Sequence, residues 1–279
     1  MNPFRSPLLS LLLLCLAITS PAFAAPKVVV TQPAIHSLLT SLMEGVDHPQ
    51  LLMEKPEDAN RPLDPFQTAH LLTADLIIWI GAGLEGNVEK TLQRFPMIRQ
   101  HTATLSLTIP LLLKKDYDGI ATDRQLSREL TFWNDPKLAM MAVKQITPTL
   151  VRLDPEHTER YLDNEIALLQ HLKQTQSEIV ERLSSLPALP EGFSAGFDRY
   201  FAHRFLPTNP TTAADTTMRK VSTDAKPFCT SSDTSHLRKG MAFYFDSIMA
   251  QAQDVITCAG KLDTGRQMAD HKPLSPTAG

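Results

Sequence analysis

Short apolar runs and amphipathic stretches alternate along the first hundred residues of this chain. Two runs, KVVVT at 27–31 and DLIIWI at 75–80, are rich in β-branched and aliphatic residues and predict buried strands. The amphipathic stretches between runs begin at Pro33 and at Asp64, which precedes a proline and predicts a helix N-cap. Weaker strand candidates are 51–53 and 102–107. Because strands alternate with helices, the pattern predicts βαβ units and a parallel sheet.

The chain then becomes helical. One helix is predicted from Asp135 to about Leu153 and a second from Asp154 to about Ser185, and each begins with Asp-Pro. A helix of about 30 residues spans about 45 Å, which is longer than one lobe needs. We therefore predict an α/β fold of two lobes, each a parallel sheet flanked by helices, joined by one long backbone helix.

The pattern weakens after this helix. Residues 207–236 are polar and rich in Thr and Ser, which predicts a loop, whereas 240–257 have helical character with Gly260 as the stop. The remainder is polar with prolines, which predicts disorder. The predicted divisions are a signal peptide at 1–24, an N-terminal lobe at 25–153, a linking helix at 154–186, a reduced C-terminal lobe at 187–260 and a disordered tail at 261–279.

The first 24 residues have the pattern of a secretory signal peptide. Arg5 supplies a positive start, residues 8–18 are apolar and uncharged, and Ala22-Phe23-Ala24 is a small-x-small cleavage site. The apolar run is too short to cross a membrane. We expect export to the periplasm and a mature chain that begins at Ala25.

Charge and motifs narrow the function classes. Without the signal peptide the chain has 26 basic and 30 acidic side chains, a net charge of −4, and no long basic block. Nucleic acid is therefore not an expected partner. The sequence has no Gly-x-Ser-x-Gly, His-Glu-x-x-His or Walker motif, and Gly81-Ala82-Gly83 lacks the later glycine of a dinucleotide fingerprint. We therefore do not expect an enzyme.

Cysteine usage agrees with export. Only Cys229 and Cys258 remain after cleavage. An even pair in an oxidising compartment predicts a disulfide, and closing a loop of roughly 30 residues contributes about 3–4 kcal/mol in the chain-entropy description. Two buried free thiols are the alternative.

The first half of the chain resembles the metal-binding substrate-binding proteins of the ZnuA/TroA type, which serve zinc or manganese ABC importers. The resemblance rests on VVVTQPAIHSLLTSLMEGV at 28–46, with its Pro-x-x-His-Ser-Leu helix start, and on LDPFQTAHLLTADLIIWIGAGLEGNVEK at 63–90. Trp133-x-Asp135-Pro136 and a final helix that ends in cysteine are similar too. The resemblance implies two α/β lobes bridged by a long helix, one metal ion in the cleft between the lobes, and delivery of that ion to an inner-membrane permease.

The positions that match the family's metal ligands carry other residues. The first histidine position is Ala59, the second is Thr131 and the third is Ala195. The fourth ligand, an acid from a late loop, has no matching position, and Asp233 is the nearest acid. Zinc needs thiolate, imidazole or carboxylate ligands, so alanine and threonine do not rebuild the family's site.

Other side chains offer donors for a replacement site. The candidates are His36, Asp58, Asp135, His203, Asp233 and His236. Each has a structural alternative, because His36 can bond to the backbone, Asp135 can cap a helix, and the others can be solvated. Zinc is the expected metal, ahead of manganese.

The sequence thus predicts an exported solute-binding protein of the zinc-uptake type, with altered or weakened metal binding in its cleft. One alternative is a metal-free family member that acts as an accessory or interaction protein in metal homeostasis. Another is a protein that binds a small organic ligand or a metal complex in a more apolar cleft.

Overall fold

The computed structural model describes residues 25–114, 127–186, 189–190, 192–206, 229, 231–234, 237 and 239–270. Its N-terminal half, which we define as residues 25–153, holds one sheet of four parallel strands in the order β2-β1-β3-β4. The strands are β1 (Val28–Val30), β2 (Gln50–Leu51), β3 (Leu76–Trp79) and β4 (Thr102–Thr104). Each of the four predicted runs contains strand residues, although 51–53 does so only at Leu51 and 102–107 only at Thr102–Thr104. The parallel sheet flanked by helices is confirmed. The predicted signal peptide lies outside the described residues.

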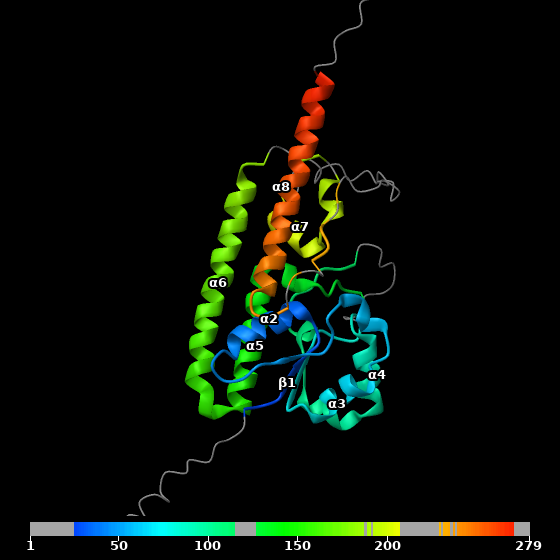
Figure 1. The fold of residues 1–279 in the computed structure, drawn as a ribbon, viewed down its shortest axis with the longest axis vertical. Coiled ribbons are helices and arrows are strands. Elements are labelled where there is room, and N and C mark those ends of the chain that lie inside the picture. The colour runs from blue at the N-terminus through cyan, green and yellow to red at the C-terminus, as the bar shows by residue number, and fades with distance from the viewer. Residues whose placement is uncertain are drawn as a thin grey trace, which may run out of the picture.

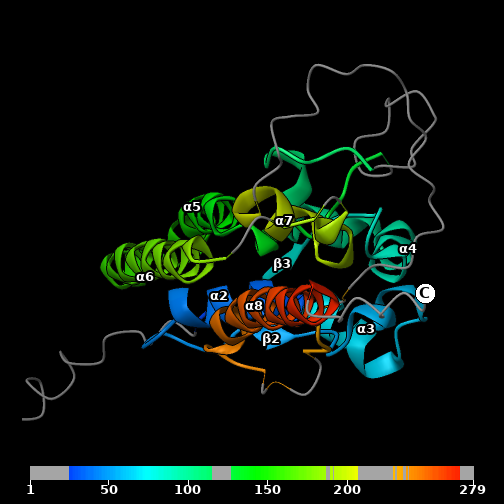
Figure 2. The same cartoon turned by 90° about the horizontal axis from the view of Figure 1, so that it is seen from above.

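Alternation along the strands divides the apolar core between the two faces of the sheet. Val28 and Val30 of β1 belong to one core cluster, whereas Val29 between them belongs to the other. The first face is covered by α2 (Pro33–Leu42) and α5 (Pro136–Leu153), and the second by α3 (Pro65–Thr73) and α4 (Gly86–Arg94). Seen from above, α3 and α4 lie on one side of the molecule and α5 lies on the opposite side (Figure 2).

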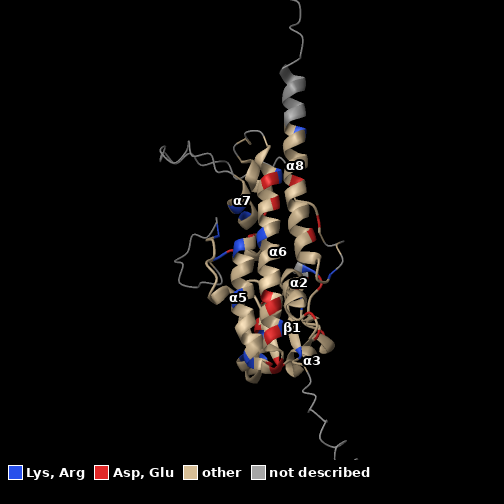
Figure 3. Ribbon diagram, turned by 90° about the vertical axis from the view of Figure 1, so that its left-hand side faces the viewer, with Lys and Arg blue, Asp and Glu red and all other residues tan. Residues whose placement is uncertain are grey.

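The long predicted helix is α6 (Thr158–Ser184), which follows α5 through a turn. Asp154 fixes this turn by accepting hydrogen bonds from Tyr161 Oη and His157 Nδ1, both at 2.8 Å. The 27 residues of α6 rise about 40 Å at the usual helical pitch. The helix lies along the molecule between α5 and α8 (Figure 3), and its inner side chains, such as Leu172 and Ile179, are buried.

The C-terminal half, which we define as residues 187–270, is built from helices where it is described. It contains a short turn at Phe193–Gly196, α7 (Arg199–Phe205) and α8 (Phe243–Asp270), which stands beside α6 and α7 (Figure 1). The described part of this half has no strand, so it is reduced further than the α/β lobe that we expected. The disulfide between Cys229 and Cys258 is present and attaches residue 229 to α8.

The predicted helix stop at Gly260 is wrong, because α8 continues to Asp270. An interior glycine costs a helix about 1 kcal/mol relative to alanine. That cost is offset because Cys258 and Ala259 are buried before it and Leu262 is partly buried after it. The expected disordered tail is therefore helical at 261–270, while residues 271–279 and most of the predicted loop at 207–236 lie outside the described residues.

A buried carboxylate connects the ends of the two central strands. Glu85 is fully buried, and its Oε1 accepts hydrogen bonds from the Thr31 hydroxyl and from Gln32 Nε2 at 3.1 Å. Its Oε2 accepts from the backbone N–H groups of Ile80 at 2.8 Å and Gly81 at 3.1 Å. Burial raises the pKa of Glu85, and the four hydrogen bonds act in the opposite direction.

Two neighbouring side chains of α2 hold distant segments in place. His36 Nε2 lies 2.9 Å from the carbonyl oxygen of Pro49, so this nitrogen carries the proton and donates. Ser37 Oγ donates to the Met241 carbonyl at 2.6 Å and accepts from the Tyr244 N–H at 3.0 Å. Ser37 thereby fixes the start of α8 against α2. None of the described helices is both long enough and apolar enough to cross a membrane.

Replacing Glu85 with Gln should lower the free energy of unfolding by about 2–3 kcal/mol. The amide –NH₂ would face two hydrogen-bond donors in a buried place, so two hydrogen bonds are lost. Urea unfolding of the mature chain followed by circular dichroism measures the change. Glu89→Gln, which removes a partly exposed ion pair with Arg99, is the control and should change stability by less than about 0.5 kcal/mol. Equal effects of the two substitutions would contradict this role of Glu85.

Acid should destabilise the protein partly through His36. Burial lowers the pKa of His36 in the folded state, so the unfolded chain binds a proton more readily than the folded chain. The stabilising contribution is present above about pH 6.5 and is lost as the pH falls through the lowered folded-state pKa. Stability measured from about pH 7.5 to 5 should therefore fall less steeply for His36→Gln than for the wild type. The exposed control His101→Gln should keep the wild-type slope.

Candidate functional site at the junction of the two halves

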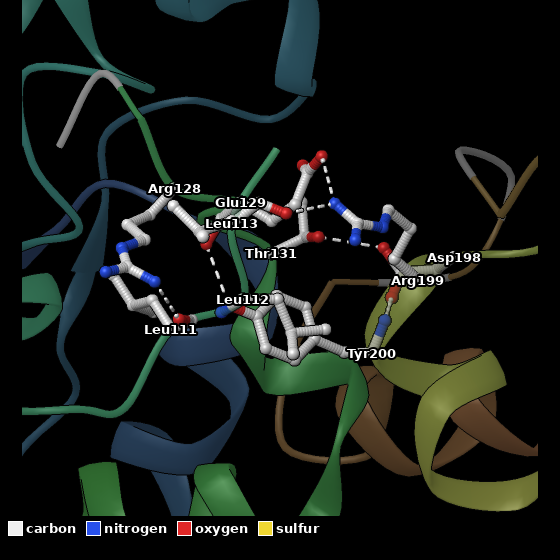
Figure 4. Close-up of polar contacts among 9 residues, drawn as sticks. All are labelled: Leu111, Leu112, Leu113, Arg128, Glu129, Thr131, Asp198, Arg199 and Tyr200. Atoms are coloured by element: carbon white, nitrogen blue, oxygen red, sulfur yellow. Dashed lines mark hydrogen bonds and ion pairs between the residues drawn. The ribbon is translucent and has the colours of Figure 1, made fainter. Parts of the chain in front are cut away.

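Two of the positions that the resemblance matches to metal ligands, Thr131 and Ala195, lie close in sequence to the start of α5 and the start of α7. We therefore describe the junction between these two segments. Polar side chains from the two halves meet there (Figure 4). We call the following residues the junction cluster: Thr131, Asp135, Asp198, Arg199, Tyr200 and Arg204.

Asp198 connects the helix start of α7 to the N-terminal half. Its Oδ1 accepts from the backbone N–H groups of Tyr200 at 2.8 Å and Phe201 at 3.2 Å, as an N-cap does. Its Oδ2 accepts from Thr131 Oγ1 at 2.8 Å, and the side chain of Asn134 also bonds to this carboxylate. Burial raises the pKa of Asp198, while these hydrogen bonds act to lower it. Four donors leave the carboxylate little capacity to bind a metal ion.

Two residues of the first turn of α7 bind the backbone of the N-terminal half. Tyr200 Oη donates to the Glu129 carbonyl at 2.8 Å and accepts from the Leu112 N–H at 2.9 Å. Burial raises the pKa of Tyr200 to about 12. Arg199 donates to the Leu113 carbonyl and lies 3.2 Å from Glu129 Oε1. The strand-like segments on either side of residues 115–126 are therefore held by α7 (Figure 4).

An ion pair closes the same junction further along α7. Arg204 donates from Nε and Nη2 to the two oxygens of Asp135, at 2.8 and 2.6 Å. Asp135 also accepts from the Lys137 N–H at 2.9 Å and so caps α5. Its side chain is only 3% exposed, and hydrogen bonding to Asp135 raises the pKa of Arg204. Asp135 therefore acts as a helix cap and an ion-pair partner, and both of its carboxylate oxygens accept hydrogen bonds.

The three positions that the resemblance matches to metal ligands have different surroundings. Ala59 is 2% exposed and packs on the sheet face covered by α3 and α4, within a 3₁₀ turn that Asn87 fixes through the Asp58 and Arg61 carbonyls. Ala195 is exposed in the turn before α7, with Phe193 and Phe197 beside it in the other core cluster. Among these three residues, Thr131 is hydrogen-bonded to the segment that contains a second one. Its partner Asp198 lies three residues after Ala195.

The other candidate ligands are dispersed. Asp58 pairs with Arg61 at 3.4 Å on the surface, His203 is exposed on α7, and Asp233 is exposed and interacts electrostatically with Lys239. His36 makes its backbone bond in α2, and His236 lies outside the described residues. Across the described segments, no three His, Cys, Asp or Glu side chains gather in a way that suits a metal ion.

Sequence reasoning did not find most of the junction cluster. Asp198 has a local signal, since an Asp before an apolar helical stretch predicts an N-cap. Its partner Thr131 is 67 residues away, and Asp135 and Arg204 are 69 residues apart. No local pattern reveals such pairs, because they depend on how α7 packs against the N-terminal half.

Comparison with known proteins gives a family match. The model of the family described as zinc-uptake complex component A, periplasmic (ZnuA) matches residues 28–228. Among curated proteins, the chain is 31% identical over 116 residues to the iron-binding protein YfeA of Yersinia pestis, which covers 42% of this chain and 35% of YfeA. It is 22% identical over 184 residues to the high-affinity zinc uptake system protein ZnuA of Haemophilus ducreyi, which covers 58% of each chain. The chain thus spans about a third to three fifths of these relatives.

Solved structures show the same fold. The periplasmic zinc-binding protein TroA of Treponema pallidum superposes with a TM-score of 0.53 at 21% identity, over 64% of each chain. A crystal structure of ZnuA gives 0.53 at 19% identity, over 65% of this chain and 68% of that one. Since the family model covers well over half of the sequence and the fold agrees, the chain belongs to the ZnuA family of periplasmic zinc-uptake components.

Proposed function

We propose that this chain is an exported solute-binding protein of the zinc-uptake ABC transporter type, which acts as a monomer in the periplasm with an inner-membrane permease. The observation that carries the proposal is the family match over residues 28–228. Two internal contacts support it, because Glu85 joins the central strands and Ser37 holds α8 against α2. In this proposal the lobes are 25–153 and 187–260, linked by 154–186.

The proposed substrate is zinc, bound more weakly than by the family's histidine set. Ala59 and Ala195 offer no ligand atom, and the hydroxyl of Thr131 is engaged with Asp198. Zinc sites in proteins use imidazole, thiolate or carboxylate at about 2.0–2.3 Å, so loss of three such positions removes most of the binding free energy. Any replacement site must draw on other side chains.

A second function is favoured by one further observation at the junction. The carboxylates of Asp135 and Asp198 already accept hydrogen bonds at both oxygens, from Arg204 and from Thr131 and the start of α7. A junction that uses its acids in this way supports a metal-free family member, which acts as an accessory or interaction protein of a metal-uptake system.

Metal titration distinguishes the two functions. Chelator-stripped mature chain, residues 25–279, is titrated with zinc and then manganese under native mass spectrometry. The first function predicts one zinc per chain that is bound weakly and lost on mild chelation, with less manganese bound. The second predicts no stoichiometric metal at micromolar zinc. One zinc that resists chelation would contradict weakened binding, and it would show that a complete replacement ligand set exists.

Restoring ligands gives a matched gain-of-function test. The double variant Thr131→His and Ala195→His should bind zinc more tightly than the wild type, because two imidazoles return to positions whose side chains are not fully buried. Adding Ala59→His should also lower stability by about 1–3 kcal/mol, since Ala59 is packed in the core. The control is His101→Ala, at an exposed position that is not a candidate ligand, and it should leave zinc binding unchanged. An unaltered zinc affinity of the double variant would count against a site at these positions.

A further inference from the structure

The junction cluster is more extensive than the capping of one short helix requires. Four side chains within seven residues, Asp198 to Arg204, each bond to the N-terminal half, and every partner belongs to residues 112–135. The bonds differ in chemistry. They comprise one hydroxyl-to-carboxylate bond, two bonds of a phenol to the backbone, the bonds of Arg199 to a carbonyl and to Glu129, and a two-pronged ion pair. They also point in several directions, so together they oppose both rotation and translation of α7 relative to the segment before α5.

The same segment also holds α8. Tyr244 Oη donates to the Trp133 carbonyl at 3.0 Å, and Gln251 Nε2 donates to Asn134 Oδ1 at 2.9 Å. Tyr244 is 1% exposed and Gln251 is 8% exposed, so water competes little for these bonds. Both described helices of the C-terminal half are therefore attached to residues 129–135.

The position of the Thr131–Asp198 bond is informative. Thr131 occupies the second ligand position, and Asp198 stands three residues after the third. In a metal-bridged protein a bound ion would connect these two segments, and removing the ion would release them. Here the connection is a hydrogen bond between protein side chains, which requires no ion.

We propose that the junction cluster holds the two halves in a single closed arrangement whether or not a metal ion is bound. The proposal rests on the family function given above, because it assigns to internal bonds the closing role of the bound metal. It implies that the protein presents the same surface to an importer in the presence and absence of zinc. An importer that recognises the closed arrangement of the two halves would then bind this chain without receiving an ion from it.

Hydrogen exchange of the mature chain, read by mass spectrometry, tests the proposal. The wild type is compared in chelator and in excess zinc, with zinc alone as the probe. Two peptides are followed, covering residues 127–135 and 198–206. Each should exchange slowly and at the same rate in chelator as in excess zinc. Slower exchange of both peptides with zinc would overturn the proposal, because closure would then depend on the metal.

The matched variant is Thr131→Val with Tyr200→Phe, which removes two hydroxyls from the junction and keeps the shapes of both side chains. It avoids Asp135 and Arg204, where loss of one partner leaves a buried charge and risks misfolding. Exchange in the same two peptides should become faster by roughly tenfold, the factor expected for lost hydrogen bonds. Residues 28–42, in β1 and α2, should change by less than about twofold.

The control Thr108→Val removes a hydroxyl that bonds to Gln145 within the N-terminal half and should leave both junction peptides unchanged. Wild-type exchange rates in the double variant would overturn the proposal. The outcome is separable from the proposed function, because zinc affinity is measured independently. Tight zinc binding with unchanged exchange would refute weakened binding and leave the closed junction standing, whereas fast, zinc-insensitive exchange would refute the junction alone.

Discussion

A buried carboxylate must have its oxygens satisfied by donors, and this constraint organises the molecule. Glu85 is placed between β1 and β3, Asp135 between α5 and α7, and Asp198 at the start of α7 against Thr131. Each carboxylate joins segments far apart in the sequence, because leaving one oxygen unpaired in the interior would cost about 1–3 kcal/mol or more. The two central strands are consequently fixed to each other by polar bonds, and so are the start of α5 and α7.

The motifs that relate this chain to its family separate into two physical kinds. His36, Ser37 and Glu85 bond to backbone or to other side chains that position helices and strands, so their loss would disturb folding. A metal ligand on the rim of a site contributes little to folding without the ion, so it can be exchanged for alanine or threonine at small cost to stability. These packing contacts are thus compatible with alanine or threonine at the positions that the resemblance matches to ligands.

The first half of the fold could be predicted because its signals are local. The runs at 27–31 and 75–80, and the Asp-Pro starts at 64 and 135, each encode a strand or a helix start within a few residues. The extent of α8 could not be predicted, since Gly260 is a local stop signal that burial of Cys258 and Leu262 overrides. The junction cluster depends on pairs 67 to 88 residues apart, and no periodicity encodes such contacts.

The long helix α6 explains why a small number of bonds at the junction is enough to hold the two halves together. α6 runs along the molecule and packs against α5, α2 and α8, so each half contacts a common stiff element. On such a support the remaining freedom is a small rotation of α7 and α8 about the segment at 129–135. The bonds of Tyr200, Arg204 and Tyr244 act on that segment from two helices, and together they oppose this rotation. Thr131 and the turn that contains Ala195 meet at the same place through Asp198, so a bond between the halves there acts directly against this rotation.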